Sequence, residues 1–175
     1  AVALTNGNIL GMNGALTASG YTLASGTVSA HLVNGNLTKT GSGTVTLTGN
    51  NTFNENGDGA TGGGQDGTGL FVQSDSVITI NNLTANGNTE EGAHLLGYDD
   101  ALNYWSPIPA VSIKLTGFNT FNGNGTDGLH FITPGNVDIT KITADANGGD
   151  GVDGSTELGN STISCGSMTN NIGYG

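Results

Sequence analysis

Short apolar stretches alternate with turns rich in glycine and asparagine along most of the chain. Within several stretches, such as residues 78–81 (ITIN) and 111–115 (VSIKL), every second side chain is apolar. This period of two is typical of a β-strand that buries one face. No long run has the 3.6-residue period of a helix, and glycine, asparagine and threonine are poor helix formers. The pattern predicts an all-β chain of short strands joined by tight turns.

The chain also repeats itself. Residues 47–57 (LTGNNTFNENG) and 115–125 (LTGFNTFNGNG) are identical at nine of eleven positions, and residues 80–85 (INNLTA) resemble residues 139–144 (ITKITA). Each unit contains three short strands and an asparagine-rich turn, and an acidic residue followed by glycine begins the next unit. Units of about 25 residues without helices are typical of a parallel β-solenoid, in which stacked turns bury a common core.

Stacking of the units predicts columns of like side chains. Because side chains alternate along a strand, five pairs are expected to point inward, one above another: Val45/Leu47, Ile78/Ile80, Ile113/Leu115, Val137/Ile139 and Ile163/Cys165. Two asparagine columns are expected at the turns: Asn54, Asn86, Asn122 and Asp145, and Asn56, Asn88, Asn124 and Asn147. Stacked amides can satisfy one another and the turn backbone, and asparagine tolerates left-handed backbone angles.

We expect a single domain over residues 1–175, with less regular turns or a cap in residues 1–40 and regular repeats in residues 41–175. The domain is expected to have about six or seven turns and two loop insertions, at residues 58–68 and 97–109. The sequence stops partway through a unit. We therefore expect a segment of a longer protein, or end-to-end self-association through the open edges of the last turn.

Composition and charge exclude several classes of protein. The 175 residues include 32 glycines, three lysines and no arginine, and the formal net charge is −11. Nucleic-acid binding requires many cationic side chains, so it is not expected. The apolar stretches are too short for membrane insertion. A single cysteine excludes an internal disulfide framework.

The first group of candidate site residues forms a column on the outer face of one predicted sheet. Alignment of the first strand of each unit places four side chains on the same outer face: Phe71, His94, His130 and Asp153. Two stacked histidines with a carboxylate on the next turn could bind a ligand. A transition metal would need three or four such ligands, and this column barely supplies three. The alternative is a solvated stack of side chains with no ligand.

The two insertions border this face and carry the other candidates. The 97–109 insertion holds Tyr98, Asp99, Asp100, Tyr104 and Trp105. Its aromatic rings could stack on sugars and its acids could accept sugar hydroxyls, since loops on a rigid scaffold often carry function. The alternative is that Trp105 folds back over the side of the solenoid. We expect no required cofactor, and calcium is the ion that the loop carboxylates would suit: Asp58, Asp66, Asp99 and Asp100.

One segment carries a family resemblance. Residues 37–53 (LTKTGSGTVTLTGNNTF) resemble the repeat of bacterial autotransporter passenger domains: a lysine, Gly-x-Gly, alternating threonine and leucine, then Gly-x-Asn-Thr and an aromatic residue. From Gly43 onward, turns such as residues 147–151 (NGGDG) are similar to the right-handed β-helix repeats of large bacterial surface proteins. The resemblance implies a single right-handed parallel β-helix in an extracellular or cell-surface protein, either an adhesin or a polysaccharide-active enzyme.

We expect the adhesin or stalk, without catalysis, with glycan or cell-surface polysaccharide as its partner. The alternative is a polysaccharide lyase or glycoside hydrolase of the β-helix type. Lyases that resemble pectate lyase use calcium-binding acids with an arginine base, and this sequence has no arginine. A glycosidase needs two carboxylates at a set separation on one face. The main outward acids, Asp138 and Asp153, are predicted to lie on different sheets.

Overall fold

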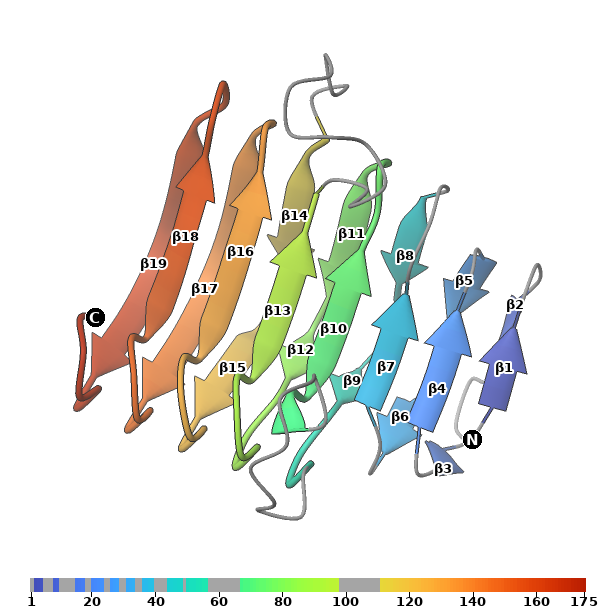
Figure 1. The fold of residues 1–175 in the computed structure, drawn as a ribbon, viewed down its shortest axis with the longest axis horizontal. Helices are drawn as coiled ribbons and strands as arrows, with labels where there is room; N and C mark the ends of the chain where they lie inside the picture. The colour runs from blue at the N-terminus through green and yellow to red at the C-terminus, as the bar shows by residue number, and fades with distance from the viewer. Residues whose placement is uncertain are drawn as a thin grey trace.

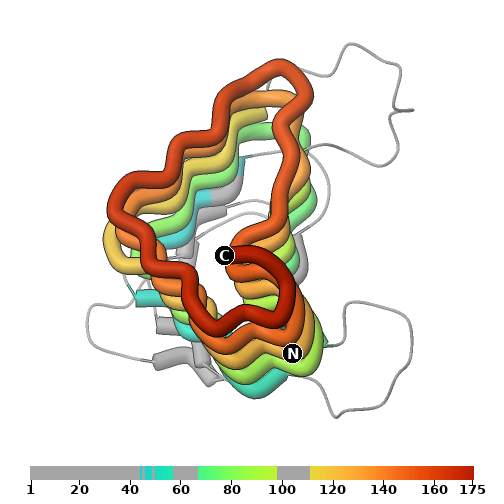
Figure 2. Tube along the Cα trace, turned by 90° about the vertical axis from the view of Figure 1, so that its left-hand side faces the viewer, coloured from blue at the N-terminus to red at the C-terminus, as the bar shows by residue number. Residues whose placement is uncertain are grey.

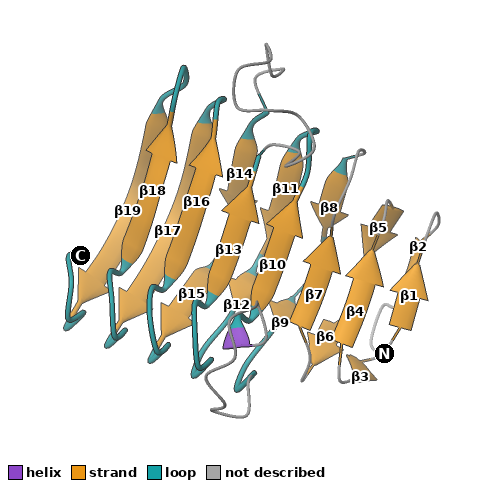
Figure 3. Cartoon of the chain, in the orientation of Figure 1, coloured by secondary structure: helices purple, strands orange, loops and turns teal. Residues whose placement is uncertain are grey.

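The computed structural model describes residues 44–48, 50–56, 67–97 and 111–175, and the backbone of the strands between Val2 and Lys39. These described parts consist of strands and turns (Figure 3). They contain no α-helix, and the one short helical element drawn in purple is a 3₁₀ turn at Gly67. The all-β prediction is therefore confirmed for them. Their short strands follow from the sequence, because glycine- and asparagine-rich turns interrupt every alternating stretch.

The first sheet contains seven parallel strands, one from each successive pass of the chain (Figure 1). In spatial order they are β1 (Val2–Leu4), β4 (Gly20–Leu23), β7 (Asn36–Lys39), β10 (Leu70–Gln73), β13 (Ala93–Leu96), β16 (Leu129–Thr133) and β18 (Val152–Thr156). The spatial order equals the sequence order. Each pass therefore returns the chain to a position beside the one before.

The second sheet has two arms that meet at one long strand, β17 (Val137–Asp145). One arm contains β2 (Asn8–Ile9), β5 (Gly26–Val28), β8 (Val45–Leu47), β11 (Ile78–Asn81) and β14 (Ile113–Thr116). The other contains β9 (Asn51–Thr52), β12 (Leu83–Thr84) and β15 (Asn119–Asn122), while β19 (Ser161–Thr169) pairs with β17 on its far side. A separate pair consists of β3 (Ala15–Thr17) and β6 (His31–Val33).

All of these pairings are parallel. β10, for example, pairs with β7 on one side and β13 on the other, with Leu70 opposite Leu37 and Ala93. Seen along the stack, successive passes of the later part of the chain follow nearly the same outline (Figure 2). The arrangement is compatible with a β-solenoid. Of the strands before residue 40, all except the separate pair β3 and β6 belong to the same sheets as the later ones.

A column of left-handed residues marks the bend between the two arms of the second sheet. Positive φ angles occur at Asn82 (50°), Gly117 (74°), Lys141 (49°) and Cys165 (60°). In β17 and β19 the strand runs through this bend, whereas in the earlier passes the bend separates two strands. Glycine and asparagine occupy such backbone angles most readily, which explains the first two positions.

The prediction that Ile163 and Cys165 form the inward pair of the last turn is wrong by two residues, because Ser161 and Ile163 occupy those positions. β19 pairs Ser161 with Val137 and Ile163 with Ile139. Cys165 falls at the bend and is exposed. The shift arises because the serine at the start of β19 takes the position that isoleucine or valine fills in the preceding turns, which alternation of apolar residues could not reveal.

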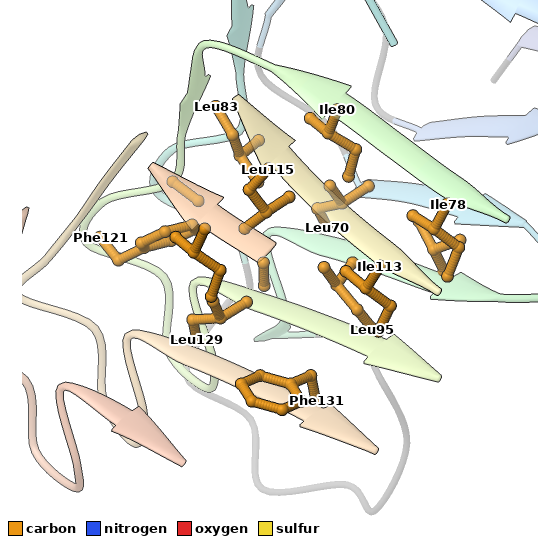
Figure 4. Close-up of a cluster of buried hydrophobic side chains, with 14 of the residues drawn as sticks. Leu70, Ile78, Ile80, Leu83, Leu95, Ile113, Leu115, Phe121, Leu129 and Phe131 are labelled. Atoms are coloured by element: carbon orange, nitrogen blue, oxygen red, sulfur yellow. The ribbon is translucent and has the colours of Figure 1, made fainter. Parts of the chain in front are cut away.

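The other inward columns are confirmed where the structure describes their side chains. The buried cluster joins the inner faces of both sheets (Figure 4). Among its members are Leu47, Phe53, Leu70, Val72, Ile78, Ile80, Leu95, Ile113, Leu115, Phe121, Leu129, Phe131, Val137 and Ile139. A buried leucine or isoleucine contributes about 1.5–3 kcal/mol relative to an exposed one. Neighbouring turns share this contribution, because each core side chain packs against those above and below it.

The inner asparagine column is continuous through the described turns. Each Nδ2 donates to the Oδ1 of the next asparagine: Asn56 to Asn88 at 2.8 Å, and Asn88 to Asn124, Asn124 to Asn147 and Asn147 to Asn171 at 2.9 Å. The same Oδ1 also accepts the backbone N–H of the asparagine one turn earlier. The predicted column is confirmed and extends by one residue, to Asn171.

The outer column points the other way along the stack. The Oδ1 atoms of Asn54, Asn86 and Asn122 accept the backbone N–H of the next member, at 2.8, 2.7 and 2.9 Å. The column ends at Asp145, whose Oδ1 accepts hydrogen bonds from Thr169 and Asn170. These hydrogen bonds lower the pKa of the exposed Asp145 carboxyl. Each turn is therefore bonded to both neighbours by side-chain amides, as well as by its strands.

Ile80→Asp is expected to unfold the domain, whereas Thr79→Asp is expected to be tolerated. The Ile80 side chain is fully buried, and an unpaired charge there costs at least about 5 kcal/mol, similar to the whole stability of a domain. Thr79 faces outward and lies opposite Lys114 in the neighbouring strand. Thermal unfolding followed by circular dichroism compares the two variants. Equal melting curves would contradict the inward assignment.

Asn124→Ala is expected to lower the free energy of unfolding by about 3 kcal/mol, because it orphans buried donors and acceptors on both neighbouring turns. Asn124 accepts from the backbone and side chain of Asn88 and donates to Asn147 and to the Ala85 carbonyl. Asn50→Ala, at an exposed position, is the control and should change the value little. Urea denaturation measures both. A loss no larger than in the control would show that the column is not stabilising.

Candidate functional site

The predicted outward column on the first sheet is present in the strand register. Phe71 lies opposite His94, His94 opposite His130, and His130 opposite Asp153, on β10, β13, β16 and β18. Their strand neighbours Leu70, Val72, Ala93, Leu95, Leu129 and Phe131 are buried in the core. Alternation along each strand therefore directs the four column side chains to the outer face of the sheet.

The rings of this column are in contact. The imidazoles of His94 and His130 stack with centroids 4.5 Å apart and planes 23° apart. Phe71 meets His94 edge-on, with centroids 5.5 Å apart and planes 87° apart. Phe71 is only 7% exposed, so little of its ring could stack on a ligand. The side chains of His94, His130 and Asp153 are 16%, 23% and 53% exposed, so exposure rises along the column.

Two carboxylates that the sequence analysis did not assign to the column also lie beside it. Glu91 precedes β13, and its Oε1 lies 3.8 Å from His94 Nδ1. Asp127 occupies the same place before β16, three residues ahead of His130. The sequence does carry a signal, because acid-Gly-x-His occurs in both turns, as EGAH and DGLH. The sequence analysis treated these acids only as turn residues and did not predict that they lie close to the histidines.

Glycine after each acid lets the turns approach closely at this corner. A Cβ at Gly92 would lie 2.5 Å from the Gly128 carbonyl oxygen, and one at Gly128 would lie 2.5 Å from that of Gly151. Any other residue would push the corners apart. The acids and histidines of successive turns therefore stack at the spacing of the sheet.

Hydrogen bonds orient the acids. The Thr68 hydroxyl donates to Glu91 Oε2 at 2.7 Å, which leaves Oε1 on the side of His94. Asp127 Oδ1 accepts the backbone N–H of Asp150 at 2.7 Å. On the next turn, His130 Nε2 lies 3.9 Å from Asp153 Oδ2. Each imidazole thus has a carboxylate at a distance just beyond a direct hydrogen bond.

The pKa of His94 is lowered from its ordinary value of 6.5. Burial of the ring is the main cause, and repulsion from His130 adds to it. Glu91 and Asp127 act in the opposite direction, because their negative charges favour the imidazolium. Burial dominates, so His94 tends to be neutral near neutral pH and keeps a nitrogen lone pair for a ligand.

Two groups of three side chains could hold a cation. Within each group, one ligand atom from each residue lies within 4.8 Å of the other two: Glu91, His94 and His130 in one, and Asp127, His130 and Asp153 in the other. His130 belongs to both. The structure therefore brings together three of the predicted residues, His94, His130 and Asp153, and adds the two acids.

The remaining predicted site residues lie outside the described residues. These are Asp58 and Asp66 in the first insertion, and Tyr98, Asp99, Asp100, Tyr104 and Trp105 in the second. Their assignment to a glycan or calcium site stays a prediction.

The lowered pKa of His94 predicts that the metal-free protein loses stability as the pH falls. The unfolded chain takes up a proton near 6.5, above the pKa of the folded state, so protonation favours unfolding below that pH. Melting temperatures measured from about pH 8 to about pH 5 in a chelator should fall less for His94→Gln than for wild type. His31→Gln, a histidine change outside the column, is the control. Equal pH dependence of wild type and His94→Gln would contradict the assignment.

Within the described residues, no helix is long and apolar enough to cross a membrane. The chain matches no protein-family model, no curated protein and no solved structure. The stacked turns of the chain and the outer column from Phe71 to Asp153 therefore carry the functional proposal.

Proposed function

We propose that this chain is a segment of a single right-handed parallel β-helix that acts, without catalysis, as a stalk or adhesin at the cell surface or outside the cell. The observation that carries the proposal is the in-register stacking of successive passes, with like side chains above one another in the core and at the asparagine turns. Such stacking makes an elongated scaffold whose length grows with the number of turns.

The right hand follows from two arguments. Crossover connections between parallel strands of one sheet are right-handed in nearly all proteins, because strand twist favours that direction. The resemblance of residues 37–53 to autotransporter passenger repeats implies the same hand. An experimental structure that resolves the course of the chain between β13 and β16 tests this point, and a left-handed course would overturn it.

The proposed ligand is a glycan or cell-surface polysaccharide, bound beside the outer column. Support comes from the partly exposed polar groups of His94, His130 and Asp153, which could hydrogen-bond to sugar hydroxyls. The aromatic residues Tyr104 and Trp105 of the second insertion would add stacking surfaces. A rigid sheet that carries these groups avoids much of the entropic cost of ordering a binding site.

The experiment combines a glycan array with an assay for newly released reducing ends. Wild type is expected to bind a subset of glycans and to release no reducing ends. Trp105→Ala and Tyr104→Ala should weaken binding with little change in melting temperature. Tyr174→Ala, which removes an exposed aromatic ring at the last turn, is the control.

Three outcomes would count against the proposal. Loss of stability without loss of binding in the Trp105 and Tyr104 variants would place these rings in a structural cover. If the protein binds no glycan, the adhesin role is contradicted and only the stalk role remains. Release of reducing ends would favour the polysaccharide-active enzyme.

End-to-end self-association is also part of the proposal. β18 and β19 lie at the edges of their sheets, and Leu158, Ile163, Ile172 and Tyr174 are exposed around this last turn. An unpaired parallel edge with apolar neighbours can accept strands of a second copy. Light scattering over a range of concentrations measures this, and Ile163→Lys should shift the protein toward the monomer. A wild type that stays monomeric throughout would refute it.

A further inference from the structure

We propose that Glu91, His94 and His130 bind one divalent transition-metal ion, of the Zn²⁺ class, on the outer face of the first sheet. The inference shares His94 and His130 with the proposed glycan site but does not rest on glycan binding, because it is argued from the distances among three side chains alone. It assigns a chemical purpose to the acid-Gly-x-His spacing that recurs in the two turns.

The distances suit a shared ion. Two ligands at about 2.0–2.1 Å from a tetrahedral ion are about 3.3 Å apart. Glu91 Oε1 and His94 Nδ1 are separated by 3.8 Å, and a ligand atom of His130 lies within 4.8 Å of both side chains. An imidazole nitrogen binds a metal through the lone pair in its ring plane. To share one ion, the two stacked rings must therefore rotate out of their stack, which also closes the remaining gaps. Both rings are partly exposed, so these rotations do not require a change in the strands.

Glu91 is already oriented for this role. The Thr68 hydroxyl, itself buried, donates to Oε2 at 2.7 Å and so presents Oε1 to His94. Outer hydrogen bonds of this kind fix ligand orientation in metal sites, and their loss typically lowers metal affinity 10–100-fold. Pairing of β13 with β16 places His94 opposite His130, so both imidazoles lie close together on neighbouring strands, with ring centroids 4.5 Å apart.

The ligand set favours a transition metal over calcium. Two imidazole nitrogens and one carboxylate suit Zn²⁺, Cu²⁺, Ni²⁺ or Co²⁺, whereas Ca²⁺ takes six to eight oxygens. Asp127 and Asp153 lie beside the same histidines and add negative charge that attracts a cation. With three protein ligands, a tetrahedral ion would keep one position for water or for a donor from a ligand.

His130 also belongs to the group with Asp127 and Asp153, so the two groups must be distinguished. We assign the ion to Glu91, His94 and His130 because this group contains both imidazoles and an oriented carboxylate. Asp153 is 53% exposed, and its carboxylate is the more strongly hydrated one. Variants at Glu91 and Asp153 separate the two assignments, since each removes a carboxylate from one group only.

The experiment uses the full chain after treatment with a chelator. Isothermal titration with Zn²⁺, and with Co²⁺ followed by its visible absorption, measures affinity and ligand type. Wild type is expected to bind one ion with micromolar or tighter affinity, to gain melting temperature with the ion and to keep it in excess Ca²⁺. His94→Gln and His130→Gln should each weaken binding at least about 10-fold, as should Glu91→Gln.

Two matched controls complete the design. His31→Gln removes the only other histidine, which lies on β6 outside the first sheet, and should leave binding unchanged. Asp153→Asn should weaken binding less than Glu91→Gln. Melting curves of the metal-free variants verify that each one is folded, so that lost binding reports on ligands.

The proposal is overturned by any of four results: no Zn²⁺ binding by wild type, displacement of the ion by Ca²⁺, an equal loss of affinity in His31→Gln, or a larger loss in Asp153→Asn than in Glu91→Gln. The last result would place the ion on Asp127, His130 and Asp153 instead. Should His94→Gln fail to fold, Glu91→Gln and Thr68→Val still test the site. Thr68→Val keeps the shape of the side chain and removes the donor to Glu91.

Discussion

Parallel pairing of each strand with its counterpart one pass later is the constraint on which the rest of this structure depends. It fixes the direction of every side chain, because a residue must lie beside the residue that holds the same place in the next turn. Apolar residues then stack into a continuous core and amides stack into columns. The ionisable groups of the outer face are subject to the same constraint, so His94 must meet His130 whether or not their interaction is favourable.

The asparagine columns show how this constraint extends to polar groups. Parallel turns leave backbone N–H groups and carbonyls at each corner that the strands do not pair. An amide supplies both a donor and an acceptor, so one residue type can serve the turn before and the turn after. The inner column donates toward the later turns, and the outer one accepts from them. Burial of so many amides is tolerable because nearly all of their atoms are satisfied.

Repetition explains how much could be predicted from the sequence. Strand type, the parallel arrangement and both asparagine columns follow from comparing units, and so does the alignment of Phe71, His94, His130 and Asp153. The prediction was wrong at Ile163 and Cys165, because the serine that begins β19 breaks the alternation used to align it.

The proximity of Glu91 to His94 was missed for a different reason. It depends on how sharply the chain turns at the corner, where Gly92 lies close to the carbonyl oxygen of Gly128 on the next turn. The recurring acid-Gly-x-His spacing is a signal for it, but the interpretation of the acids as turn residues did not use that spacing. The two insertions have no counterpart in the other units, so comparison of repeats does not predict their conformation. The binding roles assigned to their residues stay predictions.

The direction of the interstrand hydrogen bonds has a mechanical consequence. Because β1 and β18 lie at opposite ends of the first sheet, a pull between the ends of the stack acts along the hydrogen bonds rather than across them (Figure 1). Load in that direction opens the bonds of one turn before those of the next, as in a zipper. The resisting force is then set by a single interface between turns, and a longer stack would extend further under tension without becoming stronger.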